Sequence, residues 1–230
     1  MRKFQVILSI CLSLAPLAVQ SQLKSSFPPI GKEQQEQLNK FEMVVTTKEK
    51  PGKTWPIVEM RRIVRATPLT SVAIFLALDH QKEYVPNLLK SVPAKHISPT
   101  EVHTDYELKL PWPLSNSVYT HASKLSKKGD CYWVSWYMVK SNSADTVEGF
   151  SSFCPHPKGT YMEYQSFVEP KSLFAGLFEG SMIKDTSDGI EAIMKYIEKC
   201  EKSKKWLVEK YSKYILDALD GKNVYQHLMK

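Results

Sequence analysis

Polar and apolar residues alternate along much of the middle of the chain, and this period of two predicts half-buried β-strands. In residues 105–110, charged side chains alternate with Tyr106, Leu108 and Leu110. Runs of this kind predict five strands, over residues 102–110, 117–125, 131–140, 146–154 and 160–168. Residues typical of turns separate the runs, and their close spacing favours an antiparallel meander.

Strands and short helices are also predicted before the meander. Residues 41–47 and 55–64 are strand-like and flank a Pro-Gly turn, which predicts a hairpin. The pair Thr67-Pro68 suits the cap and the first position of a helix. Short helices are further predicted over residues 31–40 and 82–90.

The C-terminal part of the chain has a helical period. Ile190, Ile193 and Ile197 recur at the spacing of one helical face. We expect the chain to turn helical again after Pro170, and residues 188–191, Asp-Gly-Ile-Glu, resemble a capping box. Residues 203–205 indicate a bend. A hairpin, short helices, a meander and a final helix, in this order, predict an α+β domain.

The first predicted strand of the meander ends in Pro111-Trp112-Pro113. Proline cannot donate a hydrogen bond to a sheet, so these residues should end the strand pairing. Trp112 has two interpretations. It is either a packing residue at the rim of the fold or part of a cavity mouth or membrane-touching loop, because an indole favours half-wet sites.

The first 21 residues have the features of a signal peptide. Arg2 and Lys3 precede an apolar stretch over residues 4–19, and cleavage is expected after Ser21. The apolar stretch is short for a membrane span. We therefore expect an exported protein, periplasmic as the first choice and secreted as the second, with a flexible lead over residues 22–30.

The charge balance of the mature chain is mildly basic. Cleavage would remove two basic residues and leave 29 basic against 24 acidic residues, a net charge of +5. The lysines are scattered, which is typical of a solvated surface, and a weak preference for anionic lipid is the alternative. Nucleic acid is not an expected partner for an exported protein.

Three cysteines remain after cleavage: Cys131, Cys154 and Cys200. Export permits disulfides. A hairpin centred near residues 142–143 would place Cys131 opposite Cys154, at a Cα spacing that suits a disulfide. A slip of one residue would separate their faces, so a disulfide and buried free thiols both stay open.

Motifs of common enzymes are missing from the sequence. It contains no Gly-x-Ser-x-Gly elbow and no phosphate-binding loop. Cys154 and His156 could ligate a metal, but no further ligands are evident, so we expect no metal, no cofactor and no assigned catalytic residue. His121, Tyr119 and Glu163 could face a cavity and act as acid or base, which keeps an enzyme as an alternative.

Three stretches, in this order, resemble the START family within the helix-grip superfamily of lipid-transfer and polyketide-cyclase-like domains. ATPLTSVAIFLALDHQKEYVPNLLKS resembles the helical segment between the strand groups, and YELKLPWPLSNSVY resembles a strand and its Leu-Pro-aromatic-Pro turn. GTYMEYQSFVEPKSLFAGLFEGSMIKDTSDGIEAIMKYIEK resembles the last strand and the terminal helix. Asn116 and Ser117 stand where many members carry Arg-Asp, so no role of that pair carries over.

The resemblance covers roughly residues 35–200 and implies a fold. In a helix-grip domain, a curved antiparallel sheet wraps around a long C-terminal helix, with two short helices inserted between the strand groups and a cavity between sheet and helix. We expect this domain over residues 31–202, followed by a helical extension over residues 203–230.

The resemblance also implies a lipid or other apolar ligand. The expected lining is Leu108, Trp112, Tyr119, Trp133, Tyr137, Phe153, Tyr164, Ile190, Ile193, Met194 and Ile197. We expect a monomeric carrier or sensor that contacts membranes transiently. The alternatives are a cavity-based enzyme of the cyclase or hydrolase type and a ligand-free scaffold.

Overall fold

The computed structural model describes residues 27–110, 112, 115–171 and 179–228. The predicted signal peptide and residues 22–26 of the predicted lead lie outside the described residues. The chain divides into two compact units, Met1–Gly31 and Lys32–Lys230, and the second holds the sheet and all the described helices.

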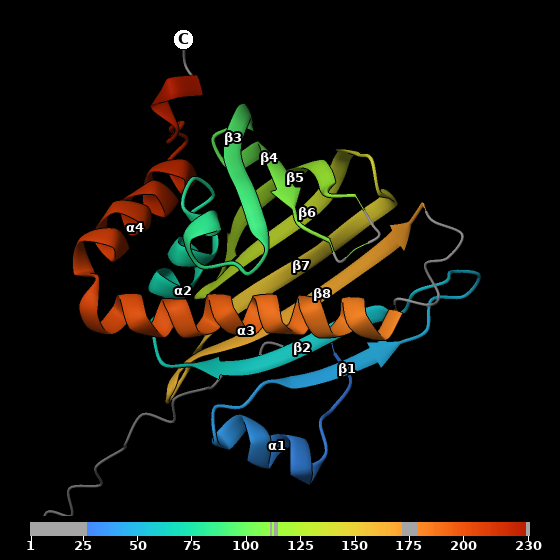
Figure 1. The fold of residues 1–230 in the computed structure, drawn as a ribbon. Helices are drawn as coiled ribbons and strands as arrows, with labels where there is room; N and C mark the ends of the chain where they lie inside the picture. The colour runs from blue at the N-terminus through green and yellow to red at the C-terminus, as the bar shows by residue number, and fades with distance from the viewer. Residues whose placement is uncertain (1–26, 111, 113–114, 172–178, 229–230) are drawn as a thin grey trace, which may run out of the picture. The chain divides into compact units, whose positions relative to one another are not determined.

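The second unit is built on one antiparallel sheet of eight strands in the order β1-β2-β8-β7-β6-β5-β4-β3 (Figure 1). The strands are β1 (Val44–Lys48), β2 (Ile57–Val64), β3 (Leu88–Ser98), β4 (Glu101–Leu108), β5 (Ser117–Lys128), β6 (Cys131–Ser141), β7 (Ala144–His156) and β8 (Gly159–Pro170). Strands β3 to β8 form a meander, and the β1–β2 hairpin joins it because β2 pairs with β8. The sheet is curved, and α3 crosses it on one side (Figure 1).

The helices are α1 (Lys32–Asn39), α2 (Pro68–Phe75), α3 (Glu179–Ser203) and α4 (Lys205–Leu219), with single 3₁₀ turns η1 (Gln81–Glu83) and η3 (Gln226–Leu228). Thr67 caps α2 as predicted, because its hydroxyl accepts a hydrogen bond from the Thr70 amide at 3.1 Å. The predicted bend is also confirmed, since α3 ends at Ser203 and α4 begins at Lys205. No helix in the described part of the chain is both long enough and apolar enough to span a membrane.

Two predictions of secondary structure were wrong. Residues 82–90 do not form a helix, because only η1 is helical there and Leu88 already begins β3. The β3–β4 pairing has three register irregularities, which break the alternating pattern that would have predicted this strand. Residues 188–191 are not a capping box, because they lie inside α3, which begins at Glu179, and the Asp188 carboxylate pairs with Lys184.

The hydrophobic core lies between the sheet and the helices α2, α3 and α4. It contains the predicted stripe of α3, namely Ile190, Ile193, Met194 and Ile197, together with Phe75 of α2 and Tyr211 of α4. Phe153 of β7 and Met162 of β8 provide its floor. The helical extension after α3 therefore shares one core with the sheet.

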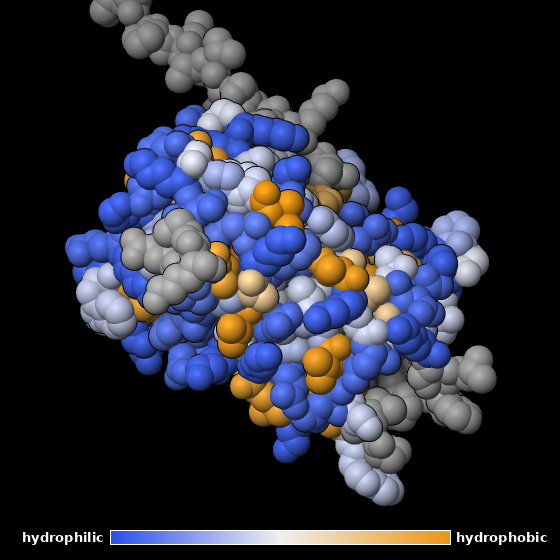
Figure 2. Space-filling view, turned by 90° about the horizontal axis from the view of Figure 1, so that it is seen from above, coloured by the Kyte–Doolittle hydropathy of each residue, from blue (hydrophilic) through white to orange (hydrophobic). Residues whose placement is uncertain are grey.

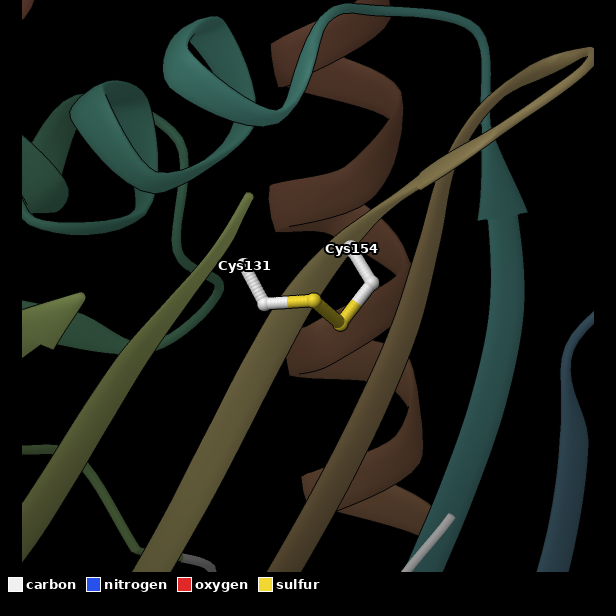
Figure 3. Close-up of a disulfide and its surroundings, with 2 residues drawn as sticks. All are labelled: Cys131 and Cys154. Atoms are coloured by element: carbon white, nitrogen blue, oxygen red, sulfur yellow. A yellow bond between two sulfur atoms is a disulfide. The ribbon is translucent and has the colours of Figure 1, made fainter. Parts of the chain in front are cut away.

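A disulfide joins Cys131 of β6 to Cys154 of β7 (Figure 3). The pairing of Tyr132 with Phe153 places the two cysteines opposite each other, with their Cα atoms 4.3 Å apart. This resolves the choice that the sequence left open. Closing a loop of this length stabilises a fold by about 3 kcal/mol.

Candidate functional site

The two faces of the sheet differ, and we call the one that packs against α2 and α3 the inner face. Side chains alternate between faces along each strand. In β6, Tyr132 and Val134 belong to the core and Trp136 packs against it, so all three lie on the inner face. Residues between them lie on the outer face.

Trp133 and Tyr137 were predicted to line the cavity, and they lie on the outer face instead. The Tyr137 side chain is exposed, and its hydroxyl donates a hydrogen bond to Glu101 at 2.8 Å. The Trp133 ring contacts Phe150, with ring centroids 5.6 Å apart. Because β6 carries aromatic residues on both faces, its sequence alone did not indicate which face is the inner one.

Six predicted lining residues lie deep in the core: Phe153, Tyr164, Ile190, Ile193, Met194 and Ile197. All are less than 10% exposed, and Met194 and Ile197 have no exposed surface. Their packing stabilises the fold, with each buried aliphatic side chain contributing about 1.5–3 kcal/mol.

The inner face is only half-buried at the end of the sheet where β4 ends and β5 begins. The predicted residues Leu108 and Tyr119 lie here, and the sequence reasoning missed Trp136 and Met138 beside them. The sequence could have indicated Trp136, because residues three positions apart in a strand lie on opposite faces, and Trp136 is three positions from Trp133.

Trp136 lies flat on the sheet over a glycine. A Cβ atom at Gly149 would come within 2.5 Å of the Trp136 ring and 2.3 Å of the Gln165 carbonyl oxygen, so only glycine fits. The indole also contacts Phe75 and Tyr164, at centroid distances of 6.3 and 5.1 Å. These contacts fix Trp136 as an aromatic floor at the border between the packed core and the half-buried surface.

Trp112 is not a packed rim residue, because 92% of its surface is exposed. Its neighbours Pro111, Pro113 and Leu114 lie outside the described residues.

On the face of the molecule that Figure 2 shows, hydrophobic residues form small separate groups among hydrophilic ones.

Two small cavities adjoin the inner face. One of about 30 Å³ lies between the first part of α3, at Met182 and Ile183, and the β2 and β8 residues Val58 and Val168. Another of about 40 Å³ lies beneath α4 and Tyr225. Each has room for two or three water molecules, whereas ligand sites usually have about 300–1,000 Å³. A lipid-sized ligand therefore requires movement of the elements that line these cavities.

Polar and aromatic groups gather on the inner face of β4 and β5. The rings of Tyr119 and His121 lie 4.5 Å apart, and those of Tyr106 and Tyr119 lie 5.2 Å apart. Burial lowers the pKa of the His121 imidazole to about 4, and it raises the pKa values of both tyrosine hydroxyls. All three groups are therefore uncharged at neutral pH.

The acid–base set proposed for the enzyme alternative is not assembled. Glu163 lies on the outer face, where it pairs with Arg61 at 3.8 Å and both side chains are buried. Tyr119 and His121 lie on the inner face, so no carboxylate of this set reaches them. Cys154 is bonded to Cys131, and no cluster of three or more metal-ligating residues occurs in the described part of the chain.

A buried ion-pair cluster anchors α3 to β2 on the inner face. Arg62 pairs with Glu191 at 2.6 Å and with Glu198 at 3.5 Å. Glu198 also accepts a hydrogen bond from the Arg65 amide at 3.2 Å. The cluster fixes the later part of α3, while the residues before it lack such an anchor.

The sequence matches no family model and no curated protein. The fold is similar to that of a STAR-related lipid transfer protein (a fragment, residues 25–204) from Xanthomonas axonopodis, with a TM-score of 0.62 and 16% identity, over 67% of this chain and 93% of that one. It is similar to human STARD10, with a TM-score of 0.62 and 14% identity, over 86% of this chain and 91% of that one.

A third similar structure is the Zhui aromatase/cyclase from Streptomyces sp. R1128, with a TM-score of 0.54 and 8% identity, over 63% of this chain and 94% of that one. At such identities the likeness shows the fold. The chain has the START-like helix-grip fold, which confirms the α+β prediction from the sequence.

Proposed function

We propose that the protein is an exported carrier or sensor that binds a lipid or other apolar ligand between the inner face of the sheet and the first part of α3. The observation that carries this proposal is the half-buried apolar end of the inner face, with Leu108, Tyr119 and Trp136, inside a helix-grip fold. The similar structure from X. axonopodis, which is named a lipid transfer protein, supports it.

Binding is favoured over catalysis because the inner face lacks a complete acid–base set. His121 has two tyrosines beside it and no carboxylate from the predicted set. The likeness to an aromatase/cyclase concerns the fold and brings no residue of this chain into a catalytic role. A ligand-free scaffold remains the other alternative, and the experiment below distinguishes it.

Native mass spectrometry of the mature protein, followed by lipid extraction, tests the proposal. We expect a bound apolar molecule, and we expect a fluorescent fatty alcohol to bind to the delipidated protein. Trp136→Ala should weaken that binding roughly tenfold, since it removes an aromatic contact. The matched control is Trp133→Ala on the outer face of the same strand, which should leave affinity unchanged. A protein that carries no ligand and binds no apolar probe would be a scaffold.

Export and membrane contact are separate parts of the proposal. The Cys131–Cys154 disulfide supports an oxidising compartment, and N-terminal sequencing of the exported protein should find Gln22 first. The exposed indole of Trp112 supports a transient membrane contact. Trp112→Ala should slow ligand transfer from vesicles without changing the melting temperature, and an unchanged transfer rate would contradict this contact.

A further inference from the structure

On the inner face of β4 and β5, two buried polar atoms of the described residues lack a hydrogen-bond partner. Thr104 of β4 lies directly opposite His121 of β5 in the strand register. The Thr104 hydroxyl oxygen and the His121 Nε2 atom are both buried, and neither has a hydrogen-bond partner within 3.5 Å among the described residues. The Tyr106 hydroxyl lies near enough to Thr104 for Thr104 to lower its pKa, but not at hydrogen-bond distance. Thr104 has no exposed surface at all. Two adjacent strands thus present two unpaired polar atoms side by side.

The neighbours of this pair within the sheet are uncharged. Residues two positions away on the same strands, and those opposite on the neighbouring strands, share its face. They are Val102, Tyr106, Tyr119, Ser123, Pro93 and Met138. The proton of the Tyr106 hydroxyl is donated to the Gln81 side-chain oxygen at 3.0 Å, so Tyr106 does not donate to Thr104 or His121.

The backbone supports a specific placement of His121. The β5–β6 pairing has a register irregularity between Thr120 and His121. Irregularities of this kind redirect a side chain, and they are common beside functional sites. The Tyr106 and Tyr119 rings, at 5.8 and 4.5 Å from the imidazole, then hold it in place.

A buried polar atom without a partner destabilises a fold, whereas valine or phenylalanine at these positions would fill similar space without that cost. We propose that Thr104 and His121 receive the polar end of the ligand, and that this end is an uncharged hydroxyl, as in a long-chain alcohol. This inference rests on the proposed binding function and names its ligand class.

The chemistry of the two atoms selects this class. A threonine hydroxyl both donates and accepts, and a neutral imidazole nitrogen does one or the other, so the pair complements an alcohol that also does both. A carboxylate or phosphate would require a nearby cation. Arg62 is already paired with Glu191 and Glu198, and the low pKa of His121 keeps its imidazole neutral.

Three probes that differ only in their end group test the inference: pyrenyldodecanol, pyrenyldodecanoic acid and pyrenyldodecane. The delipidated protein should bind the alcohol about tenfold more tightly than either of the others, the effect of one or two net hydrogen bonds. Thr104→Val and His121→Phe should each remove most of that preference, and the affinity for the hydrocarbon should stay unchanged.

A second threonine separates binding from folding. Thr160 is also fully buried, but its hydroxyl donates to the Ala66 carbonyl at 2.8 Å and accepts from Ser71 at 3.1 Å. Thr160→Val should lower the melting temperature by several degrees and leave the probe preference intact. Thr104→Val should leave the melting temperature unchanged or raise it, because it removes an unpaired atom.

The outcomes separate the two proposals. If none of the probes binds, the binding function fails and this inference fails with it. If all three bind equally, or the acid binds most tightly, the carrier stands and the alcohol class is rejected. If the variants bind the alcohol as the parent does, the two atoms serve an internal water and not the ligand, which also overturns the inference.

Discussion

The two halves of α3 differ in burial although they form one continuous helix. Residues 179–189 include no fully buried residue, and their apolar side chains Met182 and Ile183 are half-buried. Residues 190–203 include six buried residues. The first half adjoins a small cavity, whereas the second half is anchored by the Arg62 ion pairs.

The difference indicates which part of the helix holds the fold and which part can respond to a ligand. Local opening requires less free energy where few apolar side chains are buried. Gly180 and Gly189 lower the stability of the first half further, because glycine is unfavourable inside a helix. We therefore expect the second half to remain closed while the first half opens to admit a ligand.

The largest effect is expected from the ion-pair anchor. Arg62→Met should lower the free energy of unfolding by about 3–5 kcal/mol, because it leaves Glu191 and Glu198 without their buried cation. Urea unfolding measures this loss. Adding Glu191→Gln and Glu198→Gln should recover part of it. A loss below about 1 kcal/mol would mean that the ion pairs do not anchor α3.

A matched pair of isoleucines compares the packing of the two halves. Ile193 is 8% exposed in the second half, and Ile193→Ala should cost about 2–5 kcal/mol of unfolding free energy. Ile183→Ala in the half-buried first half should cost about 1 kcal/mol. Apolar probe affinity should change more for Ile183→Ala, because Ile183 borders the cavity. Equal stability losses would contradict the division.

The sequence predicted the second half of α3 better than the first. The stripe of Ile190, Ile193 and Ile197 follows the helical period, and periodicity reports burial directly. The first half has no such stripe, and residues 188–191, which resemble a capping box in the sequence, lie inside the helix. β3 was missed for a related reason, because its irregular register removes the alternation that marks a strand.

The candidate site was only partly predictable. Alternation places Trp133 and Trp136 on opposite faces, but the choice of inner face depends on which helices cover the sheet. The sequence made His121 a candidate site residue, because its side chain is titratable. Thr104 gave no signal, because its significance comes from its position opposite His121 and from its lack of a partner, and a single sequence specifies neither.

A smaller, opposite effect is expected at the junction of the two halves. A Cβ atom at Gly189 would meet no other atom within 4 Å, so Gly189→Ala should stabilise the protein by about 0.5–1 kcal/mol. Hydrogen exchange should slow in residues 179–189, and uptake of an apolar probe should slow with it. Faster uptake, or protection confined to residues 190–203, would reject the view that the first half opens.

The smallest effect is expected from the outward side of the second half. Lys195 is 69% exposed and lies 3.4 Å from Glu191, which has the closer partner Arg62 at 2.6 Å. An exposed lysine contributes little when its carboxylate is already paired, so Lys195→Ala should change the free energy of unfolding by less than about 0.5 kcal/mol. The change should also be insensitive to added salt, because the attraction between Lys195 and Glu191 is weak and salt has little of it to screen.

Parallel urea unfolding of the parent and the variant at low and high ionic strength measures both expectations. A loss above about 1 kcal/mol that disappears in salt would show that Glu191 is held from the solvent side. The anchor of α3 would then lie on its surface, and the contrast between its two halves would no longer follow from burial.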